Sequence, residues 1–476
     1  MAILAIDQGT SGTKALIREE GGGILAVEEV PVRPSYDGDR VEIDPMVLFD
    51  SIMEAANLAI SAAGNPTLHG VSLSNMGETV LAWDPETGEP LSQAIIWQDR
   101  RAETICHELA DQSEWIAERT GLVLSSYFAA PKMAWIRRNV TDRGVVTMTD
   151  AWYIKRLANE FVTDAETASS SLIVDIDRLE WDDDLLSAFN LQDEPLPRIA
   201  RNDEVVGVTS AFGAEVPLCG LVLDQQAAMV AQSCLAPGSL KCTYGTGAFM
   251  FGNAGPKAVR SPSGLTTRAA WKLRDRTEWC LVGQVYAAGS ALRWLVDLGL
   301  LSAPQALDAE SAPVSGGVKF IPALAGLAAP WWSAKPDAAF LGMGLSTTRG
   351  NLVRSVLEGI AAQVAIVARN AADEMGQPLE RLRVDGGLTR SSVMCQVQAD
   401  LVQIPVDVYP SPHATALGAA LMGELSLNES STLADVVPSW EPVATYEPQW
   451  SADQAAEFLA EWNEAVEASI AKGADR

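Results

Sequence analysis

Residues 218–251 read LCGLVLDQQAAMVAQSCLAPGSLKCTYGTGAFMF and lie almost at the middle of the chain. Asp224 ends an apolar run that predicts a buried strand, and Gln225 opens a helical pattern. A strand fixes such a carboxylate while leaving its tip open, which suits proton abstraction. A turn at 236–238 leads into another strand and the Gly/Thr turn 243–247, whose backbone N–H groups and hydroxyls suit a phosphate. We therefore expect an acid and a phosphate site on the two sides of a domain boundary.

The N-terminus has a similar design. Residues 2–6 form an apolar strand that ends at Asp7, and the Gly/Thr turn QGTSGT at 8–13 is followed by Lys14. Glycine lets backbone amides approach an anion closely, and Lys14 can meet its charge. The spacing is neither that of a Walker loop nor that of a GxGxxG turn, so an ordinary tight turn is an equal alternative. Set beside CTYGTGAFMFG at 242–252, the segment IDQGTSGTKALI at 6–17 predicts a short internal duplication.

The composition excludes several classes of protein. A chain of 476 residues is too long for one ordinary core and predicts two domains of similar size. Its net charge of −28 argues against nucleic-acid binding and against docking on anionic membranes. The six cysteines form no CxxC pair and the three histidines are scattered, which favours a reducing compartment and no zinc cluster. We find no signal peptide and no apolar run long enough to span a bilayer, so we expect a cytoplasmic protein.

Strand patterns alternate with helical patterns along both halves of the chain. Asp44 and Pro45 predict a helix start, and residues 351–375 predict a long helix buried between layers. We expect an α/β fold with one domain at 1–234 and another at 235–476. Ligand sites in such folds lie at strand ends and domain interfaces, so the cleft between the domains is the expected site.

Several short motifs, in order and spacing, resemble the FGGY family of carbohydrate kinases over nearly the whole chain, and its glycerol kinase branch most closely. The matching pieces are Asp7-Gln8-Gly9-Thr10, Trp97-Gln98-Asp99-Arg100-Arg101, Lys132 with Trp135, Asp224-Gln225-Gln226-Ala227-Ala228, Thr243-Tyr244-Gly245-Thr246-Gly247, Gly289 with Trp294, Ala329-Pro330-Trp331-Trp332, Ala338 to Glu358, Asp385-Gly386-Gly387 and Thr415-Ala416-Leu417-Gly418-Ala419-Ala420. The resemblance implies two ribonuclease-H-like domains of the actin/Hsp70/sugar-kinase ATPase fold, with an interdomain cleft.

The resemblance also implies phosphorylation of a sugar or polyol hydroxyl that depends on ATP and Mg²⁺. Asp224 would be the general base, for which helix capping is the alternative role, and Asp7 would hold the metal ion through water. The residues implied to contact the nucleotide are Thr10, Thr13, Lys14, Gly245, Thr246, Gly289, Arg293, Gly387 and Ser391. For Gly289 and Gly387 a purely conformational role in turns is an equal alternative.

The acceptor pocket implied by the resemblance consists of Gly77, Glu78, Trp97, Tyr127, Asp224, Gln225 and Phe249. Carboxylates, an amide and a phenol can hold vicinal hydroxyls, and aromatic rings can cover C–H faces, although core packing is the alternative for the rings. Glycerol kinases have arginine where this chain has Gly77, which removes a donor for a terminal hydroxyl and opens space. We therefore predict that glycerol is a poor substrate and that a polyol or ketose of four or five carbons fits better.

Two alternative functions are compatible with parts of the sequence. A xylulose- or ribulose-type kinase of the same family fits the segment at 75–77, although the Met-His pair usual in xylulose kinases is absent. An actin- or chaperone-like ATPase would share the fold, but it would need no polyol pocket. The expected partners are a small sugar or polyol and no nucleic acid or membrane, and a homodimer is compatible with the sequence.

Overall fold

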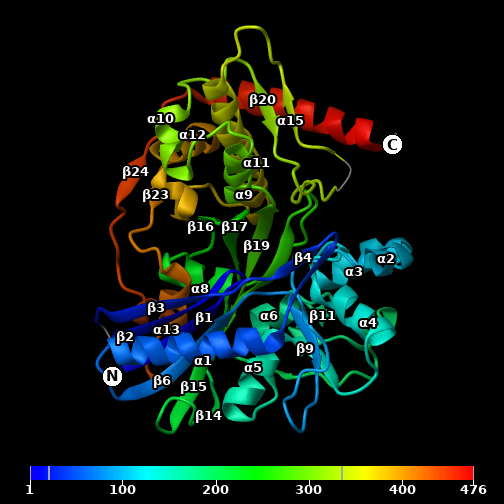
Figure 1. Cartoon of the computed structure of the whole chain (residues 1–476), viewed down its shortest axis with the longest axis vertical. Coiled ribbons are helices and arrows are strands. Elements are labelled where there is room, and N and C mark those ends of the chain that lie inside the picture. The colour runs from blue at the N-terminus through cyan, green and yellow to red at the C-terminus, as the bar shows by residue number, and fades with distance from the viewer. Residues whose placement is uncertain (1, 20–21, 334–335, 475–476) are drawn as a thin grey trace.

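Each of the two lobes of the molecule is built on one central mixed sheet (Figure 1). The computed structural model describes residues 2–19, 22–333 and 336–474. The first sheet has the order β14-β15-β6-β1-β2-β3. Its strands are β1 (Ala2–Gln8), β2 (Gly12–Glu19), β3 (Ile24–Pro31), β6 (Leu68–Asn75), β14 (Val205–Thr209) and β15 (Val216–Leu223). β1 is antiparallel to β2 and parallel to β6, so the predicted N-terminal hairpin is confirmed.

The second sheet repeats this arrangement in the order β18-β19-β17-β16-β22-β23-β24. Its strands are β16 (Leu240–Tyr244), β17 (Ala248–Gly255), β18 (Thr266–Lys272), β19 (Thr277–Val285), β22 (Leu382–Gly386), β23 (Val406–Val408) and β24 (Ala444–Tyr446). Here β16 is antiparallel to β17 and parallel to β22, as β1 is to β2 and β6. The two Gly/Thr turns predicted from the sequence therefore occupy equivalent places in two similar sheets.

A smaller sheet and several helices extend the first lobe. The sheet has the order β4-β5-β8-β7-β9, and two strand pairs, β10-β13 and β11-β12, lie beside it in sequence. The bounds are β4 (Ser35–Asp37), β5 (Arg40–Ile43), β7 (Val80–Trp83), β8 (Ala94–Ile95), β9 (Val145–Met148), β10 (Val162–Asp164), β11 (Val174–Asp175), β12 (Glu180–Trp181), β13 (Arg198–Ala200), α1 (Pro45–Ala62), α2 (Glu103–Glu108), α3 (Ser113–Thr120), α4 (Ala129–Asn139), α5 (Thr149–Ala158), α6 (Ala165–Ser169) and α7 (Asp183–Ala188). Asp44 caps α1 by accepting the backbone N–H of Met46 at 2.9 Å, as the Asp-Pro pair predicted.

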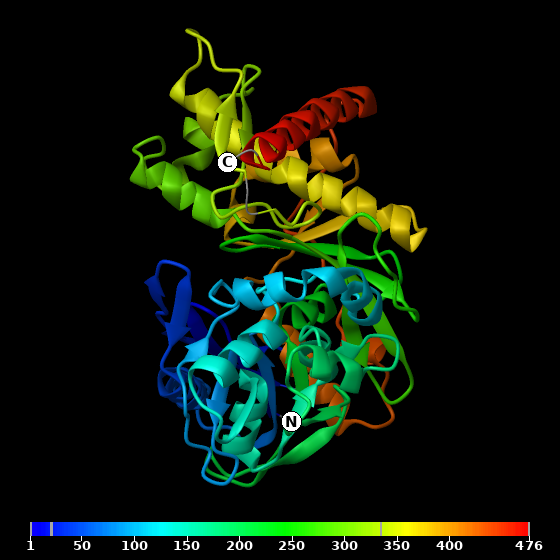
Figure 2. The ribbon, with the colours of Figure 1, turned by 90° about the vertical axis from the view of Figure 1, so that its right-hand side faces the viewer.

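The second lobe is covered by helices on the side away from the first lobe (Figure 2). They are α9 (Gly289–Asp297), α10 (Leu307–Glu310), α11 (Arg349–Met375), α12 (Ser392–Val402) and α15 (Ala452–Ala474), with the strand pair β20 (Lys319–Ile321) and β21 (Ala339–Leu341). The short helix α14 (Leu433–Val436) packs elsewhere, against a helix that returns to the first lobe. α11 begins at a capping box formed by Thr348 and Asn351 and ends at Gly376. By length and composition α11 could cross a membrane, contrary to the sequence-based expectation, but 83% of its most apolar 18-residue window is buried inside the protein. We interpret it as the core helix of the second lobe.

Two helices run between the lobes. α8 (Asp224–Ala231) links β15 of the first sheet to the hairpin of the second, and α13 (Ala414–Leu427) follows β23. Although α13 belongs to the second half of the sequence, it packs on β1, β6 and β15 of the first sheet and on α8. An atom added as Cβ at Gly418 would lie 1.7 Å from the carbonyl oxygen of Ala227. The two helix backbones are therefore in direct contact.

This contact predicts that Gly418→Ala is strongly destabilising. The added methyl group meets rigid backbone, so α8 and α13 must separate, and we expect a loss of at least about 3 kcal/mol in the free energy of unfolding. Urea unfolding measures it. Gly23→Ala is the matched control, because its added Cβ would meet nothing within 4 Å. Equal stability of the two variants would contradict the close contact.

One edge of the second sheet is hydrogen-bonded to the first lobe along β18. The backbone N–H of Thr267 donates to the carbonyl of Gly121 at 2.8 Å, and that of Ala269 donates to Ser169 Oγ at 3.0 Å. The carbonyl of Ala269 accepts Gln226 Nε2 at 2.9 Å. We call these contacts of residues 267–269 the β18 seam.

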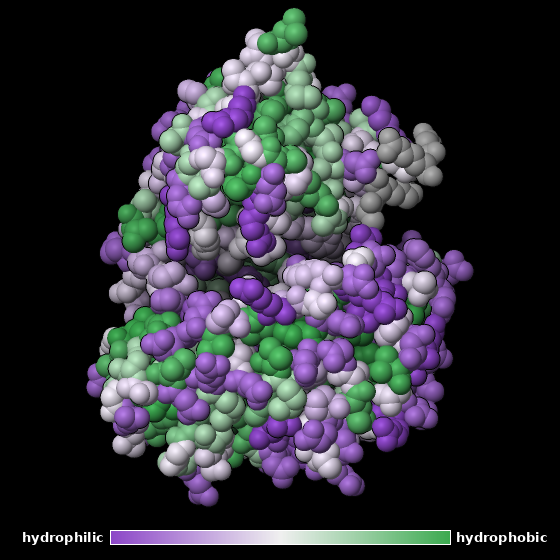
Figure 3. Space-filling view, viewed as in Figure 1, coloured by the Kyte–Doolittle hydropathy of each residue, from purple (hydrophilic) through white to green (hydrophobic). Residues whose placement is uncertain are grey.

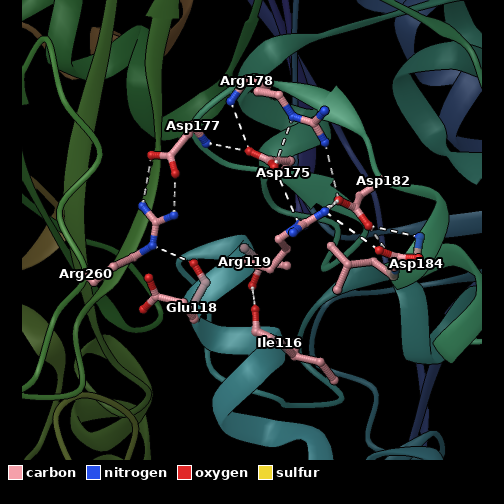
Figure 4. Close-up of polar contacts among 11 residues, drawn as sticks. Ile116, Glu118, Arg119, Asp175, Asp177, Arg178, Asp182, Asp184 and Arg260 are labelled. Carbon is pink, nitrogen blue, oxygen red and sulfur yellow. Dashed lines mark hydrogen bonds and ion pairs between the residues drawn. The ribbon is translucent and has the colours of Figure 1, made fainter.

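One ion pair between the lobes adds to the contacts of the β18 seam (Figure 4). Arg260, just before β18, donates to the carbonyl of Glu118 at 2.6 Å and pairs with Asp177 at 2.8 Å. Beside this pair, and within the first lobe, Arg119 pairs with Asp182 at 2.7 Å and with Asp175 at 3.5 Å. The lobes are thus joined both by the crossing helices and along one side of the cleft.

Candidate active site

A cavity of about 240 Å³ lies between the lobes, and we call it the cleft pocket. The first lobe contributes Thr10, Gly77, Glu78, Trp97, Tyr127, Asp224 and Gln225, and the second contributes Thr246, Phe249, Arg268, Gln284 and Arg293, among others. All seven residues that the sequence predicts for an acceptor pocket line it. The surface is hollowed between the lobes, with hydrophilic side chains around the hollow (Figure 3).

Asp224 lies where β15 ends and α8 begins, so the strand and the crossing helix both fix its position. Its Oδ1 accepts the backbone N–H of Gln225 at 2.6 Å. Burial raises the pKa of the Asp224 carboxyl above its ordinary value, and the Lys241 ammonium and the Gln225 N–H offset part of the rise. A carboxylate with a raised pKa at a pocket wall is suited to accept a proton.

A buried lysine supports this carboxylate from the second sheet. Lys241 Nζ donates to Gln225 Oε1 at 2.6 Å and to Thr243 Oγ1 at 2.9 Å, and Thr243 donates in turn to Asp385 at 2.6 Å. Burial lowers the pKa of Lys241, and the carboxylates of Asp385 and Asp224 partly restore it. The chain of contacts holds the Gln225 amide beside Asp224.

An ion pair joins the two lobes at another wall of the cleft pocket. Arg268 Nη1 lies 2.7 Å from Glu78 Oε1, and the two residues are only 2% and 3% exposed. Glu78 adopts a positive φ of 55° in the turn between β6 and β7, which aims its carboxylate at Arg268. Burial raises the pKa of Glu78, and the positive charges of Arg268 and Lys132 oppose that rise.

Aromatic rings form an apolar wall of the cleft pocket. Trp97 makes edge-to-face contacts with Tyr127 at 5.8 Å and with Phe249 at 5.9 Å between ring centroids. Trp97 Nε1 donates to Thr10 Oγ1 at 2.9 Å, which ties the ring to the N-terminal turn. The fully buried Lys132 donates to the carbonyls of residues 126–128 and so fixes the segment that carries Tyr127.

A larger cavity of about 550 Å³ lies in the second lobe, and we call it the second-domain pocket. Its lining includes Gly245, Thr246, Gly289, Arg293, Gly387 and Ser391, six of the residues predicted to contact a nucleotide. Thr246 and Arg293 line both pockets, so the two cavities adjoin there. A group bound in the second-domain pocket can therefore point its end into the cleft pocket.

The glycines of the second-domain pocket differ in their surroundings. A Cβ at Gly289 would lie 2.5 Å from the carbonyl oxygen of Gly245, so this glycine allows a close backbone approach. A Cβ at Gly387 would meet nothing within 4 Å. The Ser391 hydroxyl caps α12 by accepting the Met394 N–H at 3.0 Å and also contacts Asp308, so it is already engaged.

The remaining predicted residues lie in neither pocket. Thr13 is fully buried and its hydroxyl is 2.6 Å from that of Ser51, so it faces α1 and not a bound phosphate. Lys14 pairs weakly with Glu29 at 3.9 Å. Asp7 is the last residue but one of β1 and lies near Asp224. Burial raises the pKa of Asp7 to about 7, Lys14 lowers it, and Asp224 and Glu29 raise it further.

Arg268, Gln284 and Lys241 are site residues that the sequence reasoning missed. Each belongs to a strand of the second sheet and is almost fully buried. The available signal was a polar or charged side chain inside an otherwise apolar strand, because such a group needs a partner or a function when it is buried.

Comparison with known proteins gives a consistent result. Residues 2–231 match the N-terminal domain model of the FGGY family of carbohydrate kinases, and residues 240–427 match the C-terminal domain model. The chain is 36% identical to glycerol kinase 2 of Thermotoga maritima over 489 residues, covering 98% of each chain, and 36% identical to glycerol kinase of Leptothrix cholodnii, covering 98% and 99%.

Solved structures agree with this assignment. The crystal structure of Plasmodium falciparum glycerol kinase with ADP superposes with a TM-score of 0.90 at 29% identity, covering 98% of both chains. A ligand-bound xylulose kinase from Lactobacillus acidophilus has the same fold, with a TM-score of 0.89 at 20% identity over 99% of both chains. The predicted two-domain α/β ATPase fold is confirmed, and the chain belongs to the FGGY family of carbohydrate kinases.

Proposed function

We propose that the protein transfers the γ-phosphoryl group of ATP to a hydroxyl of a small neutral polyol or ketose of four or five carbons, with Asp224 as general base. Family membership makes the chain an ATP-dependent phosphotransferase that acts on an alcohol group of a sugar or polyol. The observation that carries the finer proposal is the junction of the two pockets at Thr246 and Arg293, with Asp224 in the wall of the cleft pocket.

The geometry supports a different binding role for each of the two pockets. The acceptor lies in the cleft pocket against Trp97 and Phe249, and its reacting hydroxyl gives its proton to Asp224 as the phosphoryl group arrives. The nucleotide lies in the second-domain pocket, where Gly387 leaves room for it. Thr246 and Arg293 stand between the two and contact the phosphates, and the walls from both lobes exclude water from the donor.

The carboxylates present fit a magnesium ion that arrives with the nucleotide. The residues that the structure describes contain no group of three His, Cys, Asp or Glu side chains that could hold a metal ion, so they form no complete metal cage. Asp224 lies close enough to Asp7 for its negative charge to raise the pKa of Asp7, and a divalent cation relieves that repulsion. Mg²⁺ keeps several waters and binds through one or two carboxylates plus phosphates. When bound, the ion neutralises charge on the phosphates, and Asp7 would orient it.

Asp7 predicts a pH-dependent stability. Its folded pKa of about 7 is above the ordinary value of 3.8, so folding favours the protonated form and stability is lost as the pH rises from about 4 to about 7. Asp7→Asn removes this loss. The melting temperature of the nucleotide-free variant should exceed that of the wild type above pH 7 and match it near pH 4.

Removing any negative charge lessens the repulsion in a chain of net charge −28 and can by itself raise the melting temperature. Asp50→Asn, on the exposed face of α1, is the control for this general effect. A gain for Asp7→Asn that is no larger than for Asp50→Asn, or that does not change with pH, would contradict the assignment. In kinetic assays the Asp7 variant should also need more Mg²⁺ for half-maximal rate.

The proposed function is tested by ADP release with glycerol, erythritol, xylitol, xylulose and ribulose as acceptors. We expect higher kcat/KM for at least one acceptor of four or five carbons than for glycerol. Glycerol equal to or better than every longer acceptor would overturn the size prediction. ATP turnover that no acceptor stimulates would overturn the kinase mechanism and favour an ATPase that uses the fold for conformational work. A cytoplasmic location and a homodimer stay predictions from the sequence.

A further inference from the structure

Arg268 reaches the cleft pocket from a strand that carries no recognised motif. It is 2% exposed, its guanidinium is 2.7 Å from the Glu78 carboxylate, and its guanidinium carbon lies 5.8 Å from the ring centre of Tyr127 and 5.6 Å from that of Phe128. Burying an arginine is costly unless its donors are satisfied. The position of Arg268 therefore requires an explanation beyond packing.

Among the described residues, several polar atoms of the Arg268 guanidinium and of the neighbouring Gln284 amide have no hydrogen-bond partner. Nε and Nη2 of Arg268 and both side-chain polar atoms of Gln284 are buried without hydrogen-bond partners among the described residues. Both residues line the cleft pocket, and Gln284 lies directly opposite Phe249 in the β17–β19 ladder. Buried polar groups without partners in a cavity indicate a polar ligand that satisfies them.

The backbone around Arg268 is held by the first lobe although β18 belongs to the second sheet. The β18 seam binds the residues on both sides of it, Thr267 and Ala269, to Gly121, Ser169 and Gln226. These hydrogen bonds hold the backbone on both sides of Arg268 against the first lobe, and they place the guanidinium beside Glu78.

The charges near the Arg268–Glu78 pair determine which kind of ligand the cleft pocket can bind. Glu78 and Asp224 contribute two carboxylates to the cleft pocket. Arg268 balances one of them, and the other cation of the lining, Arg293, lies at the junction with the second-domain pocket, where the nucleotide phosphates would take up its charge. A hydroxyl can donate to Glu78 and accept from Arg268 at the same time, whereas the carboxylate of a sugar acid would be repelled by Glu78 and Asp224.

We propose that Arg268, paired with Glu78, binds a hydroxyl of the acceptor away from the reacting one and restricts the acceptor to neutral polyols and ketoses. This inference rests on the proposed kinase function. Arg268 supplies from the second sheet the guanidinium that position 77 lacks, because Gly77 has no side chain. A Cβ at Gly77 would lie 3.1 Å from Leu223 Cδ1, so the space beside Glu78 could accept a side chain if that leucine shifts.

The experiment compares Arg268→Leu and Arg268→Lys with the wild type, using glycerol, erythritol, xylitol, xylulose and gluconate as acceptors. Losing a charged hydrogen bond should raise KM for the neutral acceptors by about 10- to 100-fold and change kcat by less than about threefold. The lysine variant should recover part of the loss. Gluconate should have a kcat/KM at least about 100-fold below that of the best neutral acceptor in the wild type.

Two further variants make the result specific. Arg276→Leu, in the turn between β18 and β19 and outside both pockets, should leave KM unchanged. The double variant Arg268→Leu, Gly77→Arg returns a guanidinium to the pocket from the other side and should regain at least about tenfold in kcat/KM. A double variant no better than Arg268→Leu would overturn the claim that the acceptor needs this group.

The folding of each variant and its activity toward the acceptors are measured separately. The melting temperature and the Kd for ATP, which binds in the second-domain pocket, report whether each variant is folded. A folded Arg268→Leu with wild-type KM for every acceptor overturns the inference and leaves the kinase function standing. If Arg268→Leu does not fold, the lysine variant decides, and an unchanged KM overturns the inference. A wild type that phosphorylates none of the acceptors overturns the proposed function and this inference with it.

Discussion

Asp224→Asn should lower kcat by about 10²- to 10⁴-fold while the protein stays folded and still binds ATP. In the wild type the backbone nitrogen of Gln225 lies 2.6 Å from Asp224 Oδ1. The side-chain oxygen of asparagine can accept the same N–H, so we expect the local structure to stay unchanged. It cannot accept the hydroxyl proton. Removing a carboxylate whose pKa is raised by burial should cost little stability at neutral pH.

The pH profile gives independent evidence for the same residue. Because the pKa of Asp224 is raised, kcat/KM of the wild type should fall on the acid side at a pH above that expected for an ordinary aspartate. The residual activity of Asp224→Asn should lack this acid limb. Asp84→Asn is the matched control, because Asp84 follows strand β7, accepts the backbone N–H of Glu86 at 2.9 Å and lies outside both pockets. An Asp224→Asn enzyme within tenfold of wild type would refute the role of this residue as general base.

Gly387→Leu should weaken ATP binding by about 100-fold or more without unfolding the protein. Its side chain would project where an added Cβ meets no atom within 4 Å, so it fills the second-domain pocket and not the core. A bound nucleotide would have to displace it, and a hundredfold loss corresponds to about 2.7 kcal/mol. Isothermal titration with ATP measures the change.

The controls for Gly387→Leu separate bulk in the pocket from the general effect of the substitution. Gly387→Ala adds one methyl group and should keep Kd within about threefold. Gly344→Leu, at another open glycine, should bind ATP as the wild type does. Stabilisation of Gly387→Leu by a polyol should be unchanged, because Gly387 lines the second-domain pocket and not the cleft pocket. Unaltered ATP binding by Gly387→Leu would place the nucleotide elsewhere.

The sequence predicted the parts of the site that local patterns determine. The strand-turn-strand pattern at both Gly/Thr turns is present, and the residue order around Asp224 is enough to place it between a strand and a helix. The seven predicted acceptor residues come from five separate segments and still line one pocket, and two of these segments, those of Trp97 and of Asp224, carry motifs quoted from the sequence.

Where partners come from distant strands, the sequence was less informative. Arg268 pairs with Glu78 only because β18 docks on the first lobe through the β18 seam, and no local pattern encodes that docking. The hydroxyl of Thr13 is turned toward Ser51 by the register of β2 against α1, which the motif does not specify. The domain division expected at 234/235 likewise gives no hint that α13 would pack on the first sheet.

The return of α13 to the first sheet affects how the protein is made. During synthesis the strands of the first sheet leave the ribosome long before residues 414–427, and at 5–20 residues per second the delay is roughly 10 to 40 s. Until then the apolar face formed by Ala5, Leu16 and Val222 lacks its cover. The first lobe can reach its final structure only after almost the whole chain has emerged, so a nascent chain that stops early exposes a surface prone to aggregation or chaperone capture.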